Sequence, residues 1–215
     1  SAGLIFVTIF CVASLLFVPF GARCLYTTPI IMAAMLVGYF DDRRGGFNEY
    51  QLAIFDLLIA GAAALVICGA HPTQIWLPGW KQALTLSPWL SVPLATGLIW
   101  LSINATNCTD GVDGLSGSLA STAIMILGGL LYAVIGNAVV AGHLSIPLNR
   151  EGANWAIMAF LMVGCLAGYL WYNAAPSLVL MGDAGSRPLG LLIGMLVTAT
   201  NNPTFIILTA SVILL

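Results

Sequence analysis

Three short polar segments, far apart in the sequence, carry the residues whose types could do chemistry. They read YFDDRR at residues 39–44, NATNCTDGVDGLSG at residues 104–117 and MGDAGSRPLG at residues 181–190. The first places two carboxylates side by side, and like charges this close repel each other unless a cation offsets them. The segments therefore suggest a site that binds a cation.

Carboxylates outnumber the positive charges in these segments. The aspartates are Asp41, Asp42, Asp110, Asp113 and Asp183, and the basic residues are Arg43, Arg44 and Arg187. Hard oxygen ligands favour magnesium, which takes one or two carboxylates and completes its shell with water and substrate phosphates. Without such a metal the carboxylates would repel an anionic substrate, so the pattern predicts phosphoryl chemistry with Mg²⁺.

Two of the segments also contain signals of helix starts. Asp110 and Asp113 have the spacing of an N-cap and a first-turn residue. Pro188 is a favoured first helical residue, and the segment before it would expose backbone amides that can approach a phosphate closely.

The elements that must position these segments are helices in a membrane. The chain is 60% hydrophobic and 7% charged, with a mean hydropathy of +1.02, too apolar for a soluble domain of 215 residues. A spanning helix needs roughly 20 mostly apolar residues. Such runs cover about residues 3–21, 24–40, 50–69, 89–106, 114–136, 154–173 and, with a polar break near its middle, 188–215. We expect an all-α polytopic transmembrane bundle with about seven or eight spans.

We expect one integral membrane domain over residues 1–215. No cleavable signal pattern opens the chain. Both ends, Ser1 and Leu215, adjoin or interrupt apolar runs. We therefore expect further residues on both sides of this sequence.

Each span carries the chain to the opposite side, because helices are the only open-chain way to satisfy backbone polar groups in lipid. Counting spans places residues 41–48, 107–113 and 174–187 on one side, and residues 22–23, 70–88 and 137–153 on the other. The three polar segments should therefore converge at one face. Three ordinary solvated loops are the alternative.

The opposite side carries fewer candidates. Residues 71–81 alternate turn residues with tryptophans, which predicts a small hairpin or an interfacial segment. His71 and His143 are expected to be surface histidines. No basic tract suggests nucleic acid. The cysteines lack a CxxC pairing and are expected to be structural, with a disulfide between Cys24 and Cys68 left open.

Two charged residues near the segments allow two interpretations each. Asp56 lies inside an apolar run, and should face the bundle as a hydrogen-bonded packing residue or face the cleft. Arg187 would touch a phosphate oxygen or snorkel beside the lipid headgroups. The small residues of Gly61–Ala64 would permit close helix packing and leave a homodimer open.

The three segments, in this order and on one face, resemble those of the polyprenyl-phosphate N-acetylhexosamine-1-phosphate transferase family. NCTDGVDG and MGDAGS are the specific motifs, and the likeness extends from the helix before Asp41 to the helix after Arg187. The resemblance implies a Mg²⁺-dependent enzyme whose active site lies on the cytoplasmic face of the bacterial plasma membrane. Its substrates would be UDP-N-acetylmuramoyl-pentapeptide and undecaprenyl phosphate, and its products would be UMP and lipid I, a precursor of peptidoglycan.

The resemblance also implies roles for individual residues. Asp41 would position or deprotonate the lipid phosphate, Asp42 would support the metal shell, and Asp183 would be both catalytic and the metal ligand. The residues implied in binding nucleotide or substrate are Asn107, Asp110, Asp113, Asn173, Gly182, Arg43 and Arg44. Arg43 or Arg44 would take the place of the lysines that usually follow the aspartate pair.

Three alternatives stay open. A UDP-N-acetylglucosamine-1-phosphate transferase of the same family would keep the chemistry and change the sugar, since no lysine lies between Asp42 and Lys81. A transferase could also use a covalent aspartyl-phosphate. A cation-coupled transporter or channel would instead place its carboxylates near the bilayer midplane, between inverted repeats.

Overall fold

The computed structural model describes residues 1–44, 46–69, 72–77 and 83–206. The helices are α1 (Gly3–Phe17), α2 (Thr28–Arg44), α3 (Glu49–Cys68), α4 (Pro88–Cys108), α5 (Leu115–Leu130), α6 (Ala138–Leu144), α7 (Gly152–Asn173) and α8 (Asp183–Ala199). A 3₁₀ turn, Arg23–Thr27, leads into α2, and a π turn, Leu131–Ile135, extends α5. The strands are β1 (Thr73–Ile75) and β2 (Leu84–Leu86).

Five helical stretches within the described residues are long and apolar enough to cross a membrane. They are Arg23–Arg43, Glu49–Cys68, Pro88–Cys108, Leu115–Ile135 and Gly152–Asn173. Large apolar side chains such as Leu58 and Trp171 point outward from the bundle, where lipid can solvate them. The chain is a polytopic helical membrane protein, which confirms the predicted fold class.

The predicted number of seven or eight spans is higher than the number of long apolar helices. The helices α1 and α8 have 15 and 17 residues, or about 23 and 26 Å at 1.5 Å per residue. Both are shorter than the roughly 30 Å hydrocarbon core. The end of the predicted run 188–215, from residue 207 onward, lies outside the described residues.

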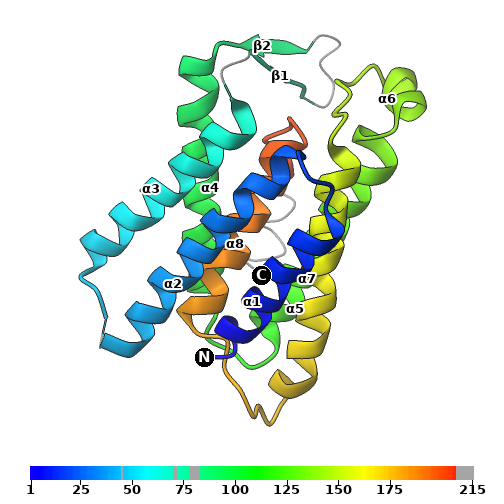
Figure 1. The fold of residues 1–215 in the computed structure, drawn as a ribbon. Helices are drawn as coiled ribbons and strands as arrows, with labels where there is room; N and C mark the ends of the chain where they lie inside the picture. Colours follow the sequence, from blue (N-terminus) through cyan, green and yellow to red (C-terminus); the bar gives the residue numbers. More distant parts are fainter. Residues whose placement is uncertain (45, 70–71, 78–82, 207–215) are drawn as a thin grey trace.

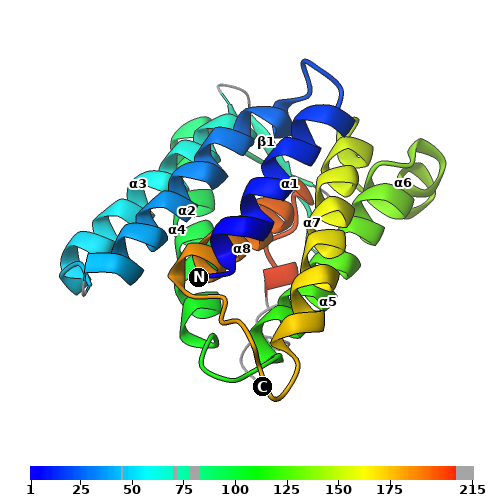
Figure 2. The same ribbon diagram turned by 60° about the horizontal axis from the view of Figure 1, so that its bottom comes forward.

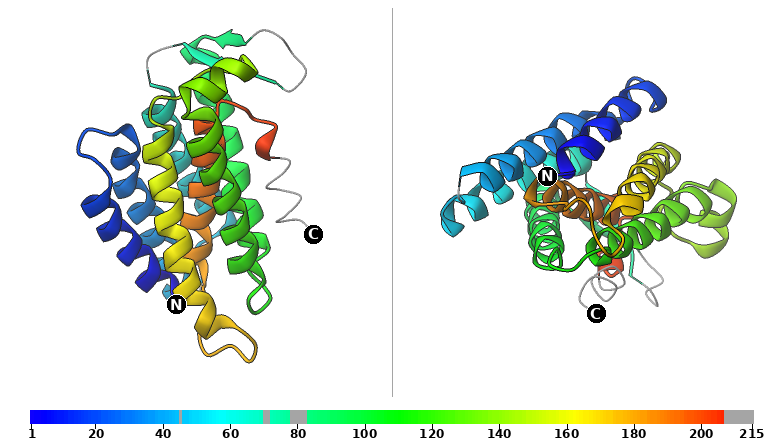
Figure 3. Two further views of the ribbon diagram at one scale, coloured as in Figure 1. Left: turned by 90° about the vertical axis from the view of Figure 1, so that its right-hand side faces the viewer. Right: turned by 90° about the horizontal axis from the view of Figure 1, so that it is seen from below.

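Helix α8 lies in the middle of the bundle (Figures 1 and 3). Every residue of α8 from Ala184 to Val197 is buried, including the polar Ser186 and Arg187. Its glycines permit close packing against α4, because a Cβ at Gly190 would lie 2.6 Å from the Cα of Ile103, and one at Gly194 would lie 2.8 Å from the Cα of Ile99. Among the described helices, the one with the largest buried share therefore begins within the MGDAGSRPLG segment, at Asp183.

The small residues of α3 are also used within one copy of the chain. Ala60, Ala63 and Ala64 are fully buried, and Gly61 faces the Thr96 methyl of α4. The packing predicted from Gly61–Ala64 is thus met between α3 and α4 of the same molecule.

Strands β1 and β2 form an antiparallel hairpin at one end of the bundle, near α6 (Figure 1). Of the two predicted alternatives, the hairpin is present, but it extends beyond residues 71–81 because β2 ends at Leu86. Its tip and His71 lie outside the described residues. His143 is exposed in α6 and lies 3.0 Å from the Val139 carbonyl oxygen through its Nδ1. All five cysteines are free, so the disulfide between Cys24 and Cys68 is not formed.

Candidate active site

The carboxylate of Asp183 is the centre of a polar cluster at the end of the bundle opposite the hairpin. Asp183 is the first residue of α8. Its Oδ1 accepts a hydrogen bond from Asn107 Nδ2 at 3.0 Å, and its Oδ2 accepts from Arg187 Nε at 3.1 Å and Nη2 at 2.9 Å. Asn107 also donates to Ser186 Oγ at 2.9 Å. The end of α4 and the first turn of α8 are therefore fixed to each other through Asp183.

The aspartate pair at the end of α2 meets the same turn. The carboxyl groups of Asp41 and Asp183 lie within hydrogen-bonding reach of each other. Asp42 Oδ1 accepts the backbone N–H of Asp183 at 3.1 Å, and its Oδ2 accepts that of Ala184 at 3.4 Å. Asp42 thus caps α8 from another helix, which a helix N-terminus favours through its unpaired amides and positive dipole end.

This cap corrects two predictions about α8. The helix begins at Asp183 and not at Pro188, which lies inside it. The amides of Asp183 and Ala184, which we expected to be exposed for a phosphate, are bonded to Asp42. A carboxylate supplied from α2 gives the chain a cap that no local sequence pattern shows, and it lets the helix start earlier.

Gly182 makes this cap possible. Its φ of +67° with ψ of 175° is a conformation that side chains rarely permit. A Cβ there would lie 2.6 Å from Asp42 Oδ2 and 2.8 Å from the Cβ of Ser1. The glycine before Asp183 is therefore required by the close approach of α2 and α8.

Arg187 and Asp56 form an ion pair inside the bundle. The residues are 3% and 2% exposed, and Arg187 Nη1 donates to Asp56 Oδ2. The packing interpretation of Asp56 is thus confirmed, and the burial of Arg187 contradicts the prediction that it snorkels beside the lipid headgroups. Contact of Arg187 with a phosphate oxygen stays a prediction. Its guanidinium binds two carboxylates, Asp56 of α3 and Asp183 of its own helix, instead of a headgroup.

Asp110 and Asp113 lie in the loop between α4 and α5, and neither caps α5. The N-cap is Gly114, with a φ of 73°, and the helix begins at Leu115. The predicted capping roles are therefore wrong, because a glycine in the left-handed region ends the turn instead. Asp113 is exposed, whereas Asp110 is half-buried. Burial, and then the negative charge of Asp183, raise the pKa of Asp110 to about 6.

Asn173 joins the remaining segments. It is buried at the end of α7, its Oδ1 accepts the N–H of Gly114 at 2.8 Å, and its Nδ2 donates to the Val179 carbonyl oxygen at 2.8 Å. Both amide groups are thus used to hold the start of α5 and the loop after α7, which lie at the same end of the bundle (Figure 2).

Arg43 lies outside this cluster. It is exposed, and its guanidinium carbon lies 5.2 Å from the ring centre of Tyr39, a cation–π contact. The side chain of Arg44 is not described. Among the described side chains, Arg187 is the one cation bonded to the clustered aspartates.

The predicted convergence of the three segments is confirmed by these contacts. Hydrogen bonds join Asn107, Asp42 and Asp183, and the charge of Asp183 acts on Asp110. Sequence reasoning missed the roles of Ser186 and of the Arg187 ion pair. The sequence signal for the Asp56–Arg187 ion pair was Asp56 itself, because a carboxylate inside an apolar helix is costly in lipid unless it has a partner.

No group of three or more Asp, Glu, His or Cys side chains in the described part of the chain is arranged to hold a metal. Asp41 and Asp183 do form a pair of adjacent carboxylates. Mg²⁺ commonly takes one or two carboxylates and fills its other positions with water and phosphate oxygens. The pair therefore fits the predicted metal in its chemistry and its number of ligands.

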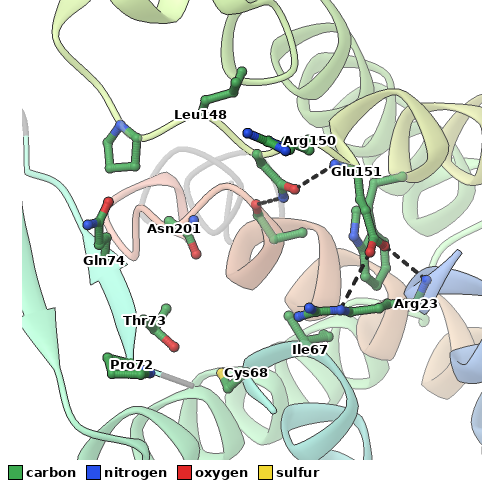
Figure 4. A pocket seen from close by; sticks show the side chains of 14 residues that line it. Arg23, Ile67, Cys68, Pro72, Thr73, Gln74, Leu148, Arg150, Glu151 and Asn201 are labelled. Carbon is green, nitrogen blue, oxygen red and sulfur yellow. Dashed lines mark hydrogen bonds and ion pairs between the residues drawn. The ribbon is translucent and has the colours of Figure 1, made fainter. Parts of the chain in front are cut away.

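A polar cavity of about 350 Å³ lies far from this cluster, at the hairpin end (Figure 4). It contains the ion pair between Arg23 and Glu151, with 3.5 Å between Arg23 Nε and Glu151 Oε1. The backbone N–H of Arg23 also donates to Glu151 Oε2 at 2.9 Å. None of the predicted site residues lines this cavity.

The fold and the cluster define a class of protein: a polytopic helical membrane protein whose clustered carboxylates lie at helix ends, with one more carboxylate inside the bundle. Within this class, the sequence model of glycosyl transferase family 4 matches residues 24–201. The chain belongs to that family.

Three curated relatives are named phospho-N-acetylmuramoyl-pentapeptide-transferase. The phospho-N-acetylmuramoyl-pentapeptide-transferase of Treponema pallidum strain Nichols is 41% identical over 219 residues, which cover 100% of this chain and 60% of the relative. Those of Nautilia profundicola and Geobacter sp. strain M21 are each 31% identical, and cover 99% and 86% of this chain. The chain spans 63% and 54% of the lengths of these two.

Proposed function

We propose that this chain transfers phospho-N-acetylmuramoyl-pentapeptide from UDP to undecaprenyl phosphate, giving lipid I and UMP for peptidoglycan synthesis. The observation that carries the proposal is the meeting of Asp41, Asp42 and Asn107 around Asp183 at one end of the bundle. The names of the relatives support the choice of sugar, and membership of the family supports the reaction type.

The reaction joins two anionic phosphates. An oxygen of undecaprenyl phosphate attacks the sugar-bearing phosphorus of the UDP-sugar, the bond to the bridging oxygen breaks, and UMP leaves with that electron pair. A phosphate monoester has a second pKa near 6, so at neutral pH its oxygen is largely ionised and needs little help from a base. The barrier is mainly the repulsion between the two substrates.

The residues of the cluster would reduce this repulsion by holding a cation and by orienting the lipid phosphate. Asp183 and Asp41 would hold Mg²⁺, which when bound supplies neutralisation of the pyrophosphate charge. Asp41 would also orient the lipid phosphate or take its remaining proton. Asp42 would keep the first turn of α8 in place, because it is bonded to the backbone of Asp183. Asp110, Asp113 and the adjoining loop would face the nucleotide, together with Gly182 and Arg43.

The location of the carboxylates argues against the transporter. A transporter site is expected near the bilayer midplane between inverted repeats. Asp41, Asp42 and Asp183 lie in the last or first turn of their helices. We infer that this end faces the cytoplasm of a bacterium, where UDP-sugars would be available to it.

The purified chain, incubated with undecaprenyl phosphate, Mg²⁺ and UDP-N-acetylmuramoyl-pentapeptide, should yield lipid I and UMP. UDP-N-acetylglucosamine in a parallel reaction tests the alternative sugar, and a lipid product only in that reaction would overturn our choice. Labelled phosphate that remains on the denatured protein would instead show the covalent aspartyl route.

Asp183→Asn should lower the turnover number by at least about a hundredfold, or about 2.7 kcal/mol of transition-state stabilisation. The amide keeps the shape of the side chain and removes its charge. If the folded variant is about as active as the wild type, Asp183 is not a metal ligand.

A further inference from the structure

We propose that Arg187, anchored by Asp56, is a positioning residue that leaves Asp183 a single carboxylate oxygen for a divalent cation. The inference deepens the proposed function, and it rests on that function only in taking Asp183 as the cation ligand. Arg187 would not touch the substrate. It acts through the carboxylate that it orients.

Hydrogen bonds occupy most of the lone pairs of the Asp183 carboxylate. An ionised carboxylate has two oxygens and about four lone-pair directions. Oδ2 accepts two hydrogen bonds from Arg187, from Nε at 3.1 Å and Nη2 at 2.9 Å. Oδ1 accepts one from Asn107 at 3.0 Å. One direction is left, on Oδ1, and Asp41 is the carboxylate within reach of this group.

Arg187 is held in place by a second carboxylate, that of Asp56. Its remaining terminal nitrogen, Nη1, binds Asp56 of α3, so one planar guanidinium is fixed at both of its ends. The guanidinium and the Asp56 carboxylate are both almost fully buried. A planar fork with five donors can serve two carboxylates in fixed directions, whereas a lysine ammonium is a compact point charge without that geometry.

The number of free oxygens on Asp183 affects which cation it can bind. Ca²⁺ takes six to eight oxygen ligands and often binds a carboxylate through both oxygens, whereas Mg²⁺ requires octahedral geometry with few protein ligands. An Asp183 that can offer only Oδ1 suits the smaller ion. The Arg187 ion pair should therefore favour Mg²⁺ over Ca²⁺ at this site.

Calorimetric titration of the purified chain with MgCl₂ and with CaCl₂ tests this inference without any measurement of turnover. In Arg187→Lys and in Asp56→Asn/Arg187→Gln, the preference for Mg²⁺ over Ca²⁺ should fall by about tenfold, the scale of one lost charge-assisted hydrogen bond. The double variant removes both charges of the buried pair, so that neither is left unpaired. It is therefore expected to fold even if a single substitution at Arg187 prevents folding.

Ser102→Ala is the matched control. Its hydroxyl donates to the Gly190 carbonyl oxygen at 2.8 Å, at the same interface between α4 and α8. This variant should lower the melting temperature and keep the wild-type ratio of the two affinities. If Arg187 had only a structural role, its variants would also have a lower melting temperature and an unchanged ratio of Mg²⁺ to Ca²⁺ affinity.

The inference is overturned if Arg187→Lys and the double variant keep the wild-type ratio, or if the wild type binds neither ion. Its failure is distinguishable from that of the proposed function. If the wild type makes lipid I and the variants keep the wild-type ion preference, only the positioning role of Arg187 is contradicted. If the wild type makes no lipid product and the variants show the predicted change in ion preference, only the proposed transferase function is contradicted.

Discussion

Gly182 and Asp42 show how a single residue can decide where a helix starts. The Asp42 carboxylate accepts the amides of Asp183 and Ala184, and it can approach them only because residue 182 has no side chain. The motif glycine thus serves the packing of two helices, beside any contact that it makes with a nucleotide.

Gly182→Ala should therefore destabilise the protein by about 1–3 kcal/mol, from backbone strain and a displaced cap. Thermal melting in detergent would measure the loss. Gly129→Ala is the matched control, because a Cβ there meets nothing within 4 Å and the residue is helical. The control should be neutral or slightly stabilising. Equal melting temperatures for both variants would contradict the account of the cap.

Asp110 predicts a dependence of stability on pH. Its pKa in the folded protein is about 6, above the ordinary 3.8, because of burial and the charge of Asp183. The folded state therefore binds a proton that the unfolded state lacks between these values. The stability from that proton is fully present below about pH 3.8 and is lost as the pH rises through 6.

The matched variant is Asp110→Asn, which cannot titrate. In the presence of a chelator, the melting temperature of the wild type relative to this variant should rise as the pH is lowered from about 7 to about 4. A difference that stays constant over this range would mean that the carboxyl of Asp110 is not perturbed.

At the scale of elements, α8 is the part that sequence patterns predicted least well. Proline at position 188 and the glycines before it indicated a helix start there, yet the helix begins at Asp183. The cap comes from α2, which is 141 residues away in sequence. Local signals cannot show a cap supplied by tertiary contact, and for the same reason the partner of Arg187 was not predictable.

The buried ion pair between α3 and α8 carries a prediction about stability. Arg187→Gln leaves Asp56 and Asp183 without their cation, and breaking a buried pair costs about 3–5 kcal/mol. Asp56→Asn/Arg187→Gln should cost less than Arg187→Gln alone. Denaturation of the two variants in detergent would give the comparison.

Arg23→Gln is the control for this prediction. The ion pair of Arg23 with Glu151 is partly exposed, at 55% and 29% for the two side chains, and such a pair contributes about 0–1 kcal/mol. If the losses in Arg187→Gln and Arg23→Gln were similar, the Arg187 pair would not hold the two helices together.

At the scale of the whole molecule, counting the spans was enough to predict that the three polar segments lie at one end of the bundle. The apolar runs up to Asn173 each contain a helix, and Asn107, Asp42 and Asp183 meet as expected. Counting sides needs only the order of the helices, so small errors in their bounds did no harm. What Asp110 and Asp113 do in the loop could not be predicted, because Asn173 and Gly114 fix it through tertiary contacts.

The central claim is that Asp41 and Asp183, from two helices far apart in sequence, share one divalent cation. Titration with Mn²⁺ measures the binding of this cation directly, because the EPR signal of free Mn²⁺ is lost when the ion binds. The titration is carried out on the wild type, Asp41→Asn and Asp183→Asn. The account predicts one bound ion in the wild type and much weaker binding in both variants, with Ser102→Ala like the wild type. Wild-type affinity in both aspartate variants would contradict it.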